Sequence, residues 1–358
     1  MYDDSFTINN AMKYAINLLG IKFIENNKRI GKYLICDICG VGSNGIVYTV
    51  ENIETNRKFA LKLLNLSYYI INTFKLDNIN YHKSVYLNIE RIKKEFDRTH
   101  YQFKDFNREI LCKFQSLPEE KSFRREFNSL KAIPKNNLCV FLEDYGVLRV
   151  DSIFEKNKTS IEIPYIVMPI FSGITLTNYI EKTDYFIKDY NKIFKILKNI
   201  IQIIKIIHDS NIIHRDLYSN NFLYNEITEE IFLLDFGASL YNNDLSLDTI
   251  GERRGARRFM SPEQFKNPQS VDFRSDYFFI GSLLFYMLTK ETPFSRERDA
   301  NTLPRDIQNF LNPSDFPNIE LYRKIVLFVN KLLAYNVKNR FQSIVEIEKN
   351  IDEILALT

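Results

Sequence analysis

Short apolar segments recur along the first half of the chain, as is typical of β-strands. The apolar positions are rich in β-branched and aromatic residues, which favour a pleated sheet. Glycine or polar residues separate the segments. We expect strands at five places, residues 33–39, 46–50, 58–64, 140–146 and 165–168.

The second half of the chain, beyond Thr175, has apolar residues at helical spacing. Residues 194–208 carry a broad apolar face, which predicts a largely buried helix. Residues 277–288 are apolar all round and predict a helix at the centre of this half, followed by two or three shorter helices between 325 and 357. A β-rich part followed by an α-rich part predicts two lobes with a cleft between them.

Three amphipathic segments interrupt this order. Residues 11–19 predict a short helix near the start of the chain. Residues 65–121 carry apolar positions among many charges, which indicates a helical insertion packed on the small lobe, with a docking surface for a partner as the alternative. Residues 122–130 predict a helix that places Glu126 and Leu130 on one face.

Composition narrows the function classes. The 358 residues are 45% hydrophobic and 26% charged, which is ordinary for a globular protein with a sizeable core. The formal charge of +3 gives no electrostatic reason to expect nucleic acid or an anionic membrane as a partner. The longest apolar stretch is too short to cross a bilayer, and the first residues lack a signal-peptide pattern. We therefore expect a cytoplasmic protein, and nothing in the sequence indicates its oligomeric state.

Four cysteines in a chain of this length do not form a disulfide framework, which favours a reducing compartment. Cys36 and Cys39 form a C-x-x-C inside an expected strand, where residues three apart point to opposite faces. Because no second C-x-x-C follows, a zinc site is disfavoured.

Two polar loops carry the strongest chemical signal. Asp216 and Asn221 lie in the first loop, and Asp235 lies in the second, with apolar strand-like residues between them. Phosphoryl transfer needs one carboxylate to orient a hydroxyl and oxygen ligands to hold magnesium. The spacing of these residues therefore predicts a phosphoryl-transfer site.

A glycine-rich segment near residue 40 indicates how phosphates could be held. Gly40, Gly42 and Gly45 form a G-x-G-x-x-G, and strand-like residues both precede and follow them. Strand following strand puts the glycines at a hairpin tip, where backbone N–H groups can approach phosphates; a merely flexible hairpin is the alternative. Lys62 lies at an inward position of the next strand, where a phosphate would compensate its charge, and Ala60 leaves room for a flat base.

With these motifs in chain order, residues 31–355 resemble the protein-kinase superfamily. The resemblance implies an α+β, two-lobed fold with a small β-rich N-lobe, one key helix in that lobe, and a larger helical C-lobe. Residues 1–30 would be a helical extension, 31–170 the N-lobe with its insertion at 65–121, and 171–358 the C-lobe.

The resemblance also implies roles for individual residues. Lys62 would contact the ATP phosphates and pair with Glu126, while Asp216 would take the proton of the acceptor hydroxyl. Asn221 and Asp235 would hold Mg²⁺. The remaining nucleotide contacts would come from the glycines over the phosphates and from an adenine pocket, namely Gly40, Gly42, Gly45, Val47, Ala60, Leu223, Met168, Pro169 and Phe171.

Other matching residues imply structural roles. His214 and Phe236 would stack in a spine with Leu130. Glu263 would pair with Arg340. The remaining two are Asp276, which would hold the backbone of the catalytic loop, and His208, which we interpret as a packing residue.

The sequence departs from the family pattern near the transferred phosphate. Tyr218 stands where serine/threonine kinases have a lysine, and Ala256 replaces the threonine that contacts it. A cation is still expected to offset developing charge, and the candidates are Arg253, Arg254, Arg257 and Arg258. A second hypothesis pairs Arg215 with a phosphate on one of three hydroxyl residues, Ser239, Ser246 or Thr249.

These observations favour an ATP- and Mg²⁺-dependent protein kinase acting on a protein substrate, with serine or threonine as acceptor. One alternative is a pseudokinase that binds nucleotide or partners without transfer, although Lys62, Glu126, Asp216, Asn221 and Asp235 are all retained. The other is a small-molecule phosphotransferase of the aminoglycoside type, which the Ser-Pro-Glu segment and Arg340 disfavour.

Overall fold

The computed structural model divides the chain into two compact units. The first unit contains residues 1–124 and 142–170, and the second contains 125–141 and 171–358. Within these units the structure describes residues 29–41, 45–64, 118–151, 160–182, 189–242, 258–267, 270–295, 299 and 301–358.

Several predictions from the sequence lie outside the described residues. They concern the helix at 11–19, Gly42 of the hairpin tip, and residues 65–117 of the insertion. Ala256 and three of the four candidate arginines also lie outside, whereas Arg258 is described and exposed.

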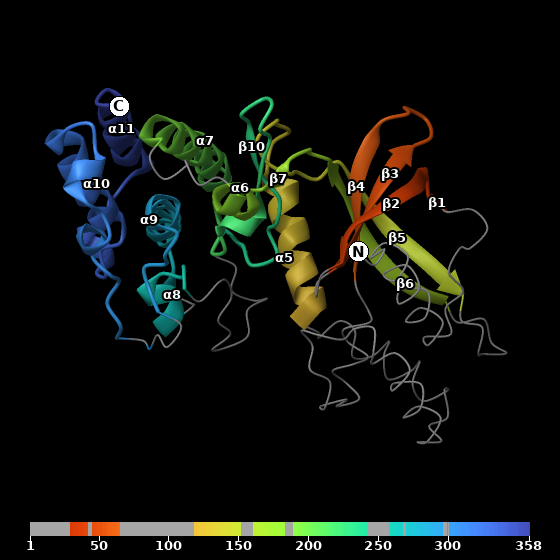
Figure 1. Ribbon diagram of the computed structural model, residues 1–358. Helices are drawn as coiled ribbons and strands as arrows, with labels where there is room; N and C mark the ends of the chain where they lie inside the picture. Colours follow the sequence, from red (N-terminus) through yellow and green to blue (C-terminus); the bar gives the residue numbers. More distant parts are fainter. Residues whose placement is uncertain are drawn as a thin grey trace, which may run out of the picture. The chain divides into compact units, whose positions relative to one another are not determined.

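An antiparallel sheet of six strands forms the first unit, in the order β1-β2-β3-β4-β6-β5 (Figure 1). The bounds are β1 Arg29–Ile30, β2 Tyr33–Val41, β3 Gly45–Asn52, β4 Lys58–Leu64, β5 Asp144–Asp151 and β6 Ser160–Pro169. Buried side chains of the sheet pack against each other, as where the rings of Tyr33 and Phe59 form an edge-to-face contact. The strand–strand hairpin expected from residues 33–50 is confirmed by the β2–β3 pairing.

One expected strand is displaced. Residues 140–146 were expected to form it, but β5 begins only at Asp144. Val140 donates its N–H to the carbonyl of Leu233 at 3.1 Å, and Cys139 forms a parallel bridge with the same residue. The apolar run is therefore divided between two partners, and its first part belongs to the second unit.

The alternation argument for Cys36 and Cys39 does not hold in β2. The β2–β3 register shifts between Ile35 and Asp37 and again between Ile38 and Gly40. Each irregularity resets which face a residue occupies. Both thiols are exposed, and Sγ of Cys39 lies 2.8 Å from Oγ1 of Thr49.

The second unit is mainly helical. Its long helices are α7 Tyr190–Asp209, α9 Phe273–Thr289, α10 Ile319–Leu332 and α11 Ile344–Leu355. A fifth long helix, α5 Pro118–Ala132, begins within the predicted insertion and belongs to the second unit from Arg125 onward. Helix α9 is buried along nearly its whole length, as its continuous apolar sequence predicts, and it packs against α7 and α10 (Figure 1). Close packing there depends on Gly281, because a Cβ at this position would lie 2.7 Å from Cβ of Leu332.

Polar N-caps fix where these helices begin. The side chains of Asp189, Asp272, Asn318 and Ser343 accept backbone N–H groups at the starts of α7, α9, α10 and α11. None of the helices in the described part of the chain is long and apolar enough to cross a membrane.

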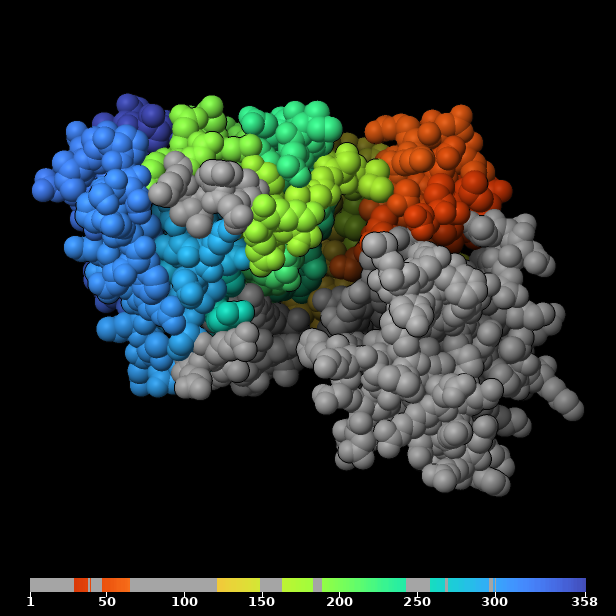
Figure 2. Space-filling model, viewed as in Figure 1, coloured from red at the N-terminus to blue at the C-terminus, as the bar shows by residue number. Residues whose placement is uncertain are grey.

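Short strands of the second unit frame the polar loops. The strands are β7 Ile174–Thr175, β8 Ile212–Ile213, β9 Phe222–Tyr224, β10 Ile231–Leu233 and β11 Leu240–Tyr241, and they pair as β10-β9-β7 and β11-β8. Short helices complete this part, α6 Leu176–Lys182, η3 Ser219–Asn221, α8 Pro262–Lys266, η6 Ile307–Asn309, η7 Pro313–Asp315 and η8 Val337–Asn339. The β9–β10 turn lies beside the start of α7, where Lys192 is 3.7 Å from Glu229, and both segments are green in Figure 2.

Candidate active site

The loop between β8 and β9 is closed by one of its own side chains. Asn221 donates from Nδ2 to the carbonyl oxygen of Asp216 at 2.7 Å and to its carboxylate oxygen Oδ2 at 3.4 Å. These bonds use the amide nitrogen of Asn221, so its oxygen Oδ1 remains the atom suited to a metal. Asp216 and Asn221, five residues apart in sequence, are thereby fixed relative to each other.

Asp276, at 1% exposure on the buried helix α9, anchors the same loop. Its Oδ2 accepts the backbone N–H of His214 at 2.9 Å, and its Oδ1 accepts that of Arg215 at 3.0 Å. The predicted structural role of Asp276 is confirmed. His208 does more than the packing that we expected, because its Nε2 lies 2.9 Å from Oδ2 of Asp276.

Asp235 follows β10, and its carboxylate oxygen Oδ1 accepts the N–H of Gly237 at 2.7 Å. The next residue, Phe236, is fully buried, with its ring centroid 4.9 Å from that of His214. The two rings are in contact as predicted, but they are tilted by 59° instead of stacked, and the contact with Leu130 stays a prediction. Burial lowers the pKa of His214, so its imidazole is neutral at neutral pH and its role is structural.

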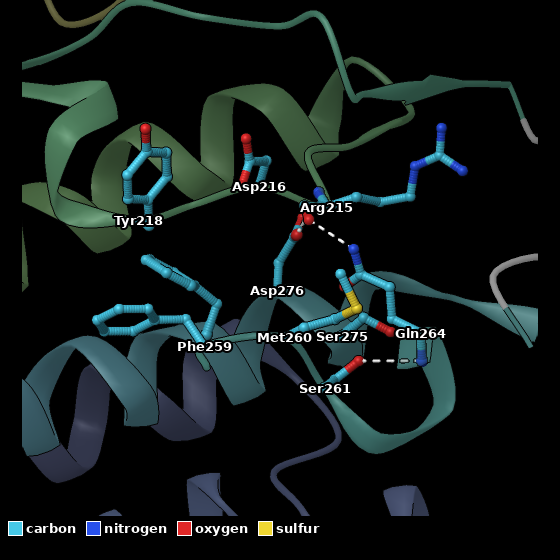
Figure 3. Close-up of a pocket in the computed structure, with 10 residues that line it drawn as sticks. Arg215, Asp216, Tyr218, Phe259, Met260, Ser261, Gln264, Ser275 and Asp276 are labelled. Carbon is cyan, nitrogen blue, oxygen red and sulfur yellow. Dashed lines mark hydrogen bonds between the residues drawn. The ribbon is translucent and has the colours of Figure 1, made fainter. Parts of the chain in front are cut away.

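Tyr218 shares the side of the loop toward which Asp216 points. In Figure 3 both side chains extend away from Asp276. Burial and then the nearby charge of Asp216 raise the pKa of Tyr218; the charge of Asp235 adds to this, and a hydrogen bond with Asn220 opposes it. The phenol therefore stays protonated at neutral pH and can donate a hydrogen bond beside the carboxylates.

Beneath the loop lies a small pocket with an apolar wall of Phe259, Met260 and Phe279 (Figure 3). Gln264 connects this wall to the loop, because its Nε2 donates to the carbonyl of Arg215 at 2.6 Å and its backbone N–H donates to Oγ of Ser261. Sequence reasoning missed Gln264, and the only signal for it is its place directly after the Ser-Pro-Glu motif.

The predicted pair of Glu263 and Arg340 is confirmed as a bidentate salt bridge. Nη1 and Nη2 of Arg340 donate to Oε1 and Oε2 of Glu263 at 2.7 and 2.6 Å. Ser275 adds a third hydrogen bond, to Oε1, at 2.7 Å. Burial alone would raise the pKa of Glu263, but the hydrogen bonds and charge of Arg340 lower it below its ordinary value.

In the first unit, strand register gathers predicted nucleotide-binding residues on one sheet face. Val47 lies opposite Lys62, and Lys62 lies opposite Ile166. Two residues before Lys62 in β4, Ala60 lies opposite Met168. Directly opposed residues share a face, and residues two apart in one strand do so too. Val47, Ala60, Lys62 and Met168 therefore share a face, and Lys62 is only 7% exposed.

The remaining predicted site residues are distributed over both units. Gly40 lies opposite Val47 in β2, Gly45 begins β3, and Pro169 ends β6. Three further residues belong to the second unit, Glu126 on α5, Phe171, whose ring stacks at 4.3 Å on Phe232, and Leu223, which lies opposite Phe232.

One phosphate hypothesis is wrong for this structure. Ser239 is 0% exposed, and its hydroxyl donates to the carbonyl of Phe236 at 2.6 Å. The guanidinium of Arg215 is buried and donates to the carbonyls of Ala238 at 2.7 Å and Ser239 at 3.3 Å. A phosphate on Ser239 has no room here. The other two hydroxyl residues, Ser246 and Thr249, lie outside the described residues.

A model of the protein kinase domain family matches residues 105–350, well over half of the chain. The chain belongs to the protein kinase family. The matched residues include both polar loops, whereas the glycine hairpin and Lys62 precede them.

Curated relatives are serine/threonine-protein kinases. A probable one from Clostridium acetobutylicum is 28% identical over 196 residues, 54% of this chain and 28% of the relative. PknB of Mycobacterium tuberculosis is 26% identical over 191 residues, 53% of this chain and 30% of PknB. The chain thus spans less than a third of the length of these relatives.

Solved structures agree on the fold. The PknI kinase domain of Mycobacterium tuberculosis matches with a TM-score of 0.57 and 16% identity, over 93% of this chain and all of that domain. The expected α+β kinase fold, with a β-rich N-terminal part and a helical C-terminal part, is confirmed.

Proposed function

We propose that the chain is an ATP-dependent protein kinase that transfers the γ-phosphoryl group of ATP to a serine or threonine hydroxyl of a protein. One observation carries the proposal: Nδ2 of Asn221 donates hydrogen bonds to both the backbone carbonyl and the carboxylate of Asp216. These two bonds orient the proposed base, Asp216, beside Oδ1 of Asn221, the proposed magnesium ligand, as phosphoryl transfer requires. The names of the curated relatives support the same activity.

Asp216 acts on the acceptor. Its carboxylate accepts the proton of the acceptor hydroxyl while that oxygen forms a bond to the γ-phosphorus. The bond between the γ-phosphorus and the bridging oxygen breaks, and ADP leaves with the electron pair. Asp276 keeps the loop rigid during this step through its two bonds to backbone N–H groups.

The donor set of the second unit fits magnesium. Oδ1 of Asn221 and the carboxylate of Asp235 are hard oxygen ligands, which Mg²⁺ prefers. When bound, the ion would neutralise charge on the phosphate oxygens. Gly237 holds one carboxylate oxygen of Asp235 at 2.7 Å and so limits the directions in which the other can point.

Lys62 supplies positive charge to the nucleotide phosphates, and Glu126 orients Lys62. Burial of Lys62 at 7% exposure supports this role, because a buried ammonium requires compensating negative charge. Backbone N–H groups of Gly40, Gly42 and Gly45 cover the phosphates. The adenine contacts come from Val47, Ala60, Leu223, Met168, Pro169 and Phe171.

Transfer of radiolabelled phosphate tests the proposal. Wild type and Asp216→Ala are incubated with labelled ATP and Mg²⁺, with and without a generic protein acceptor, and phosphoamino acids are then identified. We expect labelled serine or threonine with wild type and none with Asp216→Ala. Label on tyrosine alone would overturn the choice of acceptor.

Absence of transfer by wild type, with nucleotide binding retained, would replace the proposal by the pseudokinase alternative. ATP turnover that no protein acceptor stimulates would instead favour a small-molecule phosphotransferase.

A further inference from the structure

Four consecutive backbone carbonyls after Asp235 all accept hydrogen bonds. We call residues 235–239 the Asp235 turn. The carbonyl of Phe236 accepts from the backbone N–H of Ser239 at 3.0 Å and from its hydroxyl at 2.6 Å. The carbonyls of Gly237, Ala238 and Ser239 accept from arginine side chains at 3.3, 2.7 and 3.3 Å.

Helix α5 supplies one side of this arrangement. Nε of Arg125 donates to the carbonyl of Gly237. Oγ of Ser129, one helical turn later, lies 2.7 Å from Oγ of Ser239. Because the hydroxyl proton of Ser239 is given to Phe236, Ser129 must be the donor in this pair. Two side chains of α5 therefore bind the turn.

The catalytic loop supplies the other side. Arg215 donates from Nε to Ala238 and from Nη2 to Ser239. Arg125, Ser129, Arg215 and Ser239 are all buried, so water does not compete for these bonds. A hydrogen bond shielded from water is stronger and harder to exchange than one at the surface.

The donors are sequence neighbours of the proposed catalytic residues. Arg125 precedes Glu126, and Arg215 precedes Asp216. Between Arg125 and the carboxylate of Asp235 lies a single residue, Gly237, whose carbonyl accepts from Arg125 and whose N–H donates to Oδ1 of Asp235. Helix α5 is thus connected to the Asp235 carboxylate through one residue.

We propose that Arg125, Ser129 and Arg215 are positioning residues that hold the Asp235 carboxylate in its magnesium-binding orientation, with Ser239 as the residue of the turn that accepts the bond from Ser129. The inference rests on the proposed function, because it takes Asp235 as the magnesium ligand. These bonds fix the turn without a phosphate, so its geometry does not depend on modification of a hydroxyl in the turn.

Ser129→Ala is the sharpest variant, because Ser239 can still donate to Phe236 and only one of the two bonds from α5 is lost, while Arg125 still donates to Gly237. We expect the Mg²⁺ concentration for half-maximal transfer to rise roughly tenfold, the lower range for losing a residue that orients a metal ligand. The rate at saturating Mg²⁺ should stay near that of wild type. The Ser129→Ala/Ser239→Ala double variant should be no worse than Ser239→Ala, because both remove the same link.

Amide hydrogen exchange of residues 237–239 gives a readout that needs no activity. It should accelerate at least severalfold in Ser129→Ala. Thr292→Val is the matched control, since it removes a buried hydroxyl that donates to the carbonyl of Phe294 at 2.7 Å, outside the turn. Arg125→Lys, which keeps the charge but removes the Nε donor, provides a second variant if Ser129→Ala folds poorly.

Faster exchange together with a higher Mg²⁺ requirement, both absent in Thr292→Val, would support the proposal. Faster exchange with an unchanged Mg²⁺ requirement would reduce these residues to a structural role and overturn it. Unchanged exchange in both Ser129→Ala and Arg125→Lys would also overturn it. If wild type transfers no phosphate, the proposed function fails, and the exchange rates alone decide whether α5 holds the turn.

Discussion

Tyr218 and Asp216 extend in the same direction from one loop, and the raised pKa of Tyr218 keeps its proton in place. At the residue scale this arrangement offers a neutral hydrogen-bond donor at the position where serine/threonine kinases have a lysine. A donor aimed at developing negative charge lowers the barrier to transfer without changing the affinity for ATP.

We predict that Tyr218→Phe lowers kcat roughly fivefold, as expected for losing one neutral hydrogen bond of about 1 kcal/mol, and leaves KM for ATP unchanged. Tyr218→Lys should restore the rate, because an ammonium also donates. Steady-state kinetics measure both. Tyr286→Phe, which removes a hydroxyl bonded to Glu181, is the control. Equal rates for Tyr218→Phe and wild type would show that the Tyr218 hydroxyl does not contribute to phosphoryl transfer.

His214 gives stability a defined pH dependence. Burial lowers its pKa in the folded state from an ordinary value of about 6.5, so the unfolded chain takes up this proton first. The contribution of His214 to stability is therefore complete above pH 6.5 and is lost as the pH falls below that value. We predict that His214→Phe weakens the decline of urea midpoints between pH 7 and pH 5. An unchanged slope would contradict this assignment.

Residue types alone did not reveal some of these roles. His208 follows an apolar helical face and was interpreted as a packing residue. Its Nε2 nevertheless lies within hydrogen-bond distance of Oδ2 of Asp276, which is 68 residues later in the sequence. Ser239 looks like an exposed loop hydroxyl, yet it is buried against Ser129. Both partners are distant in sequence, so no local pattern could indicate them. Asp276, Glu263 and Arg340, by contrast, were predicted because the family motifs carry them.

At the scale of elements, periodicity predicted the long helices of the second half of the chain and most strands of the first unit. Strand β4 has the predicted bounds, and α9 is buried as its continuous apolar sequence indicates. The failure at residues 140–146 has a physical cause, because two different partners compete for one apolar run. The local sequence pattern predicts that a segment is buried, but the segment with which it pairs determines where its strand begins.

The Glu263–Arg340 salt bridge joins α8 to the segment before α11, and its removal should affect the stability of the second unit. Arg340 is 1% exposed, so Arg340→Met would leave the Glu263 carboxylate buried without its cation. We predict a loss of about 3–5 kcal/mol in the free energy of unfolding, measured by urea denaturation.

Lys198→Ala is the matched control, because Lys198 forms an exposed pair with Asp352 at 2.6 Å. Exposed pairs contribute at most about 1 kcal/mol. Similar losses for the two variants would show that burial does not set the strength of the Glu263–Arg340 pair.

At the scale of the whole molecule, the proposed nucleotide-binding residues come from both units. Val47, Ala60, Lys62 and Met168 belong to the first, and Asn221, Leu223 and Asp235 to the second. The sequence predicted this division through the family resemblance. The two-part fold is confirmed, and the roles of the individual residues remain predictions.

We predict that a non-hydrolysable ATP analogue with Mg²⁺, at about 100 times its dissociation constant, stabilises the protein by about 2.7 kcal/mol. Thermal unfolding measures this shift. Lys62→Met in the first unit and Asp235→Asn in the second should each reduce the shift at the same ligand concentration. A full shift in either variant would remove that residue from the proposed nucleotide site.

The bonded carbonyls of the Asp235 turn also bear on inhibitor discovery. A compound that displaces Phe236 must separate its buried ring from His214 and move carbonyls that accept hydrogen bonds from Arg125, Arg215 and Ser239. Compounds that leave the turn in place keep the contact between Phe236 and His214 and the hydrogen bonds to the turn carbonyls. A screening library for this chain should therefore be weighted toward scaffolds that fit around an unmoved Phe236.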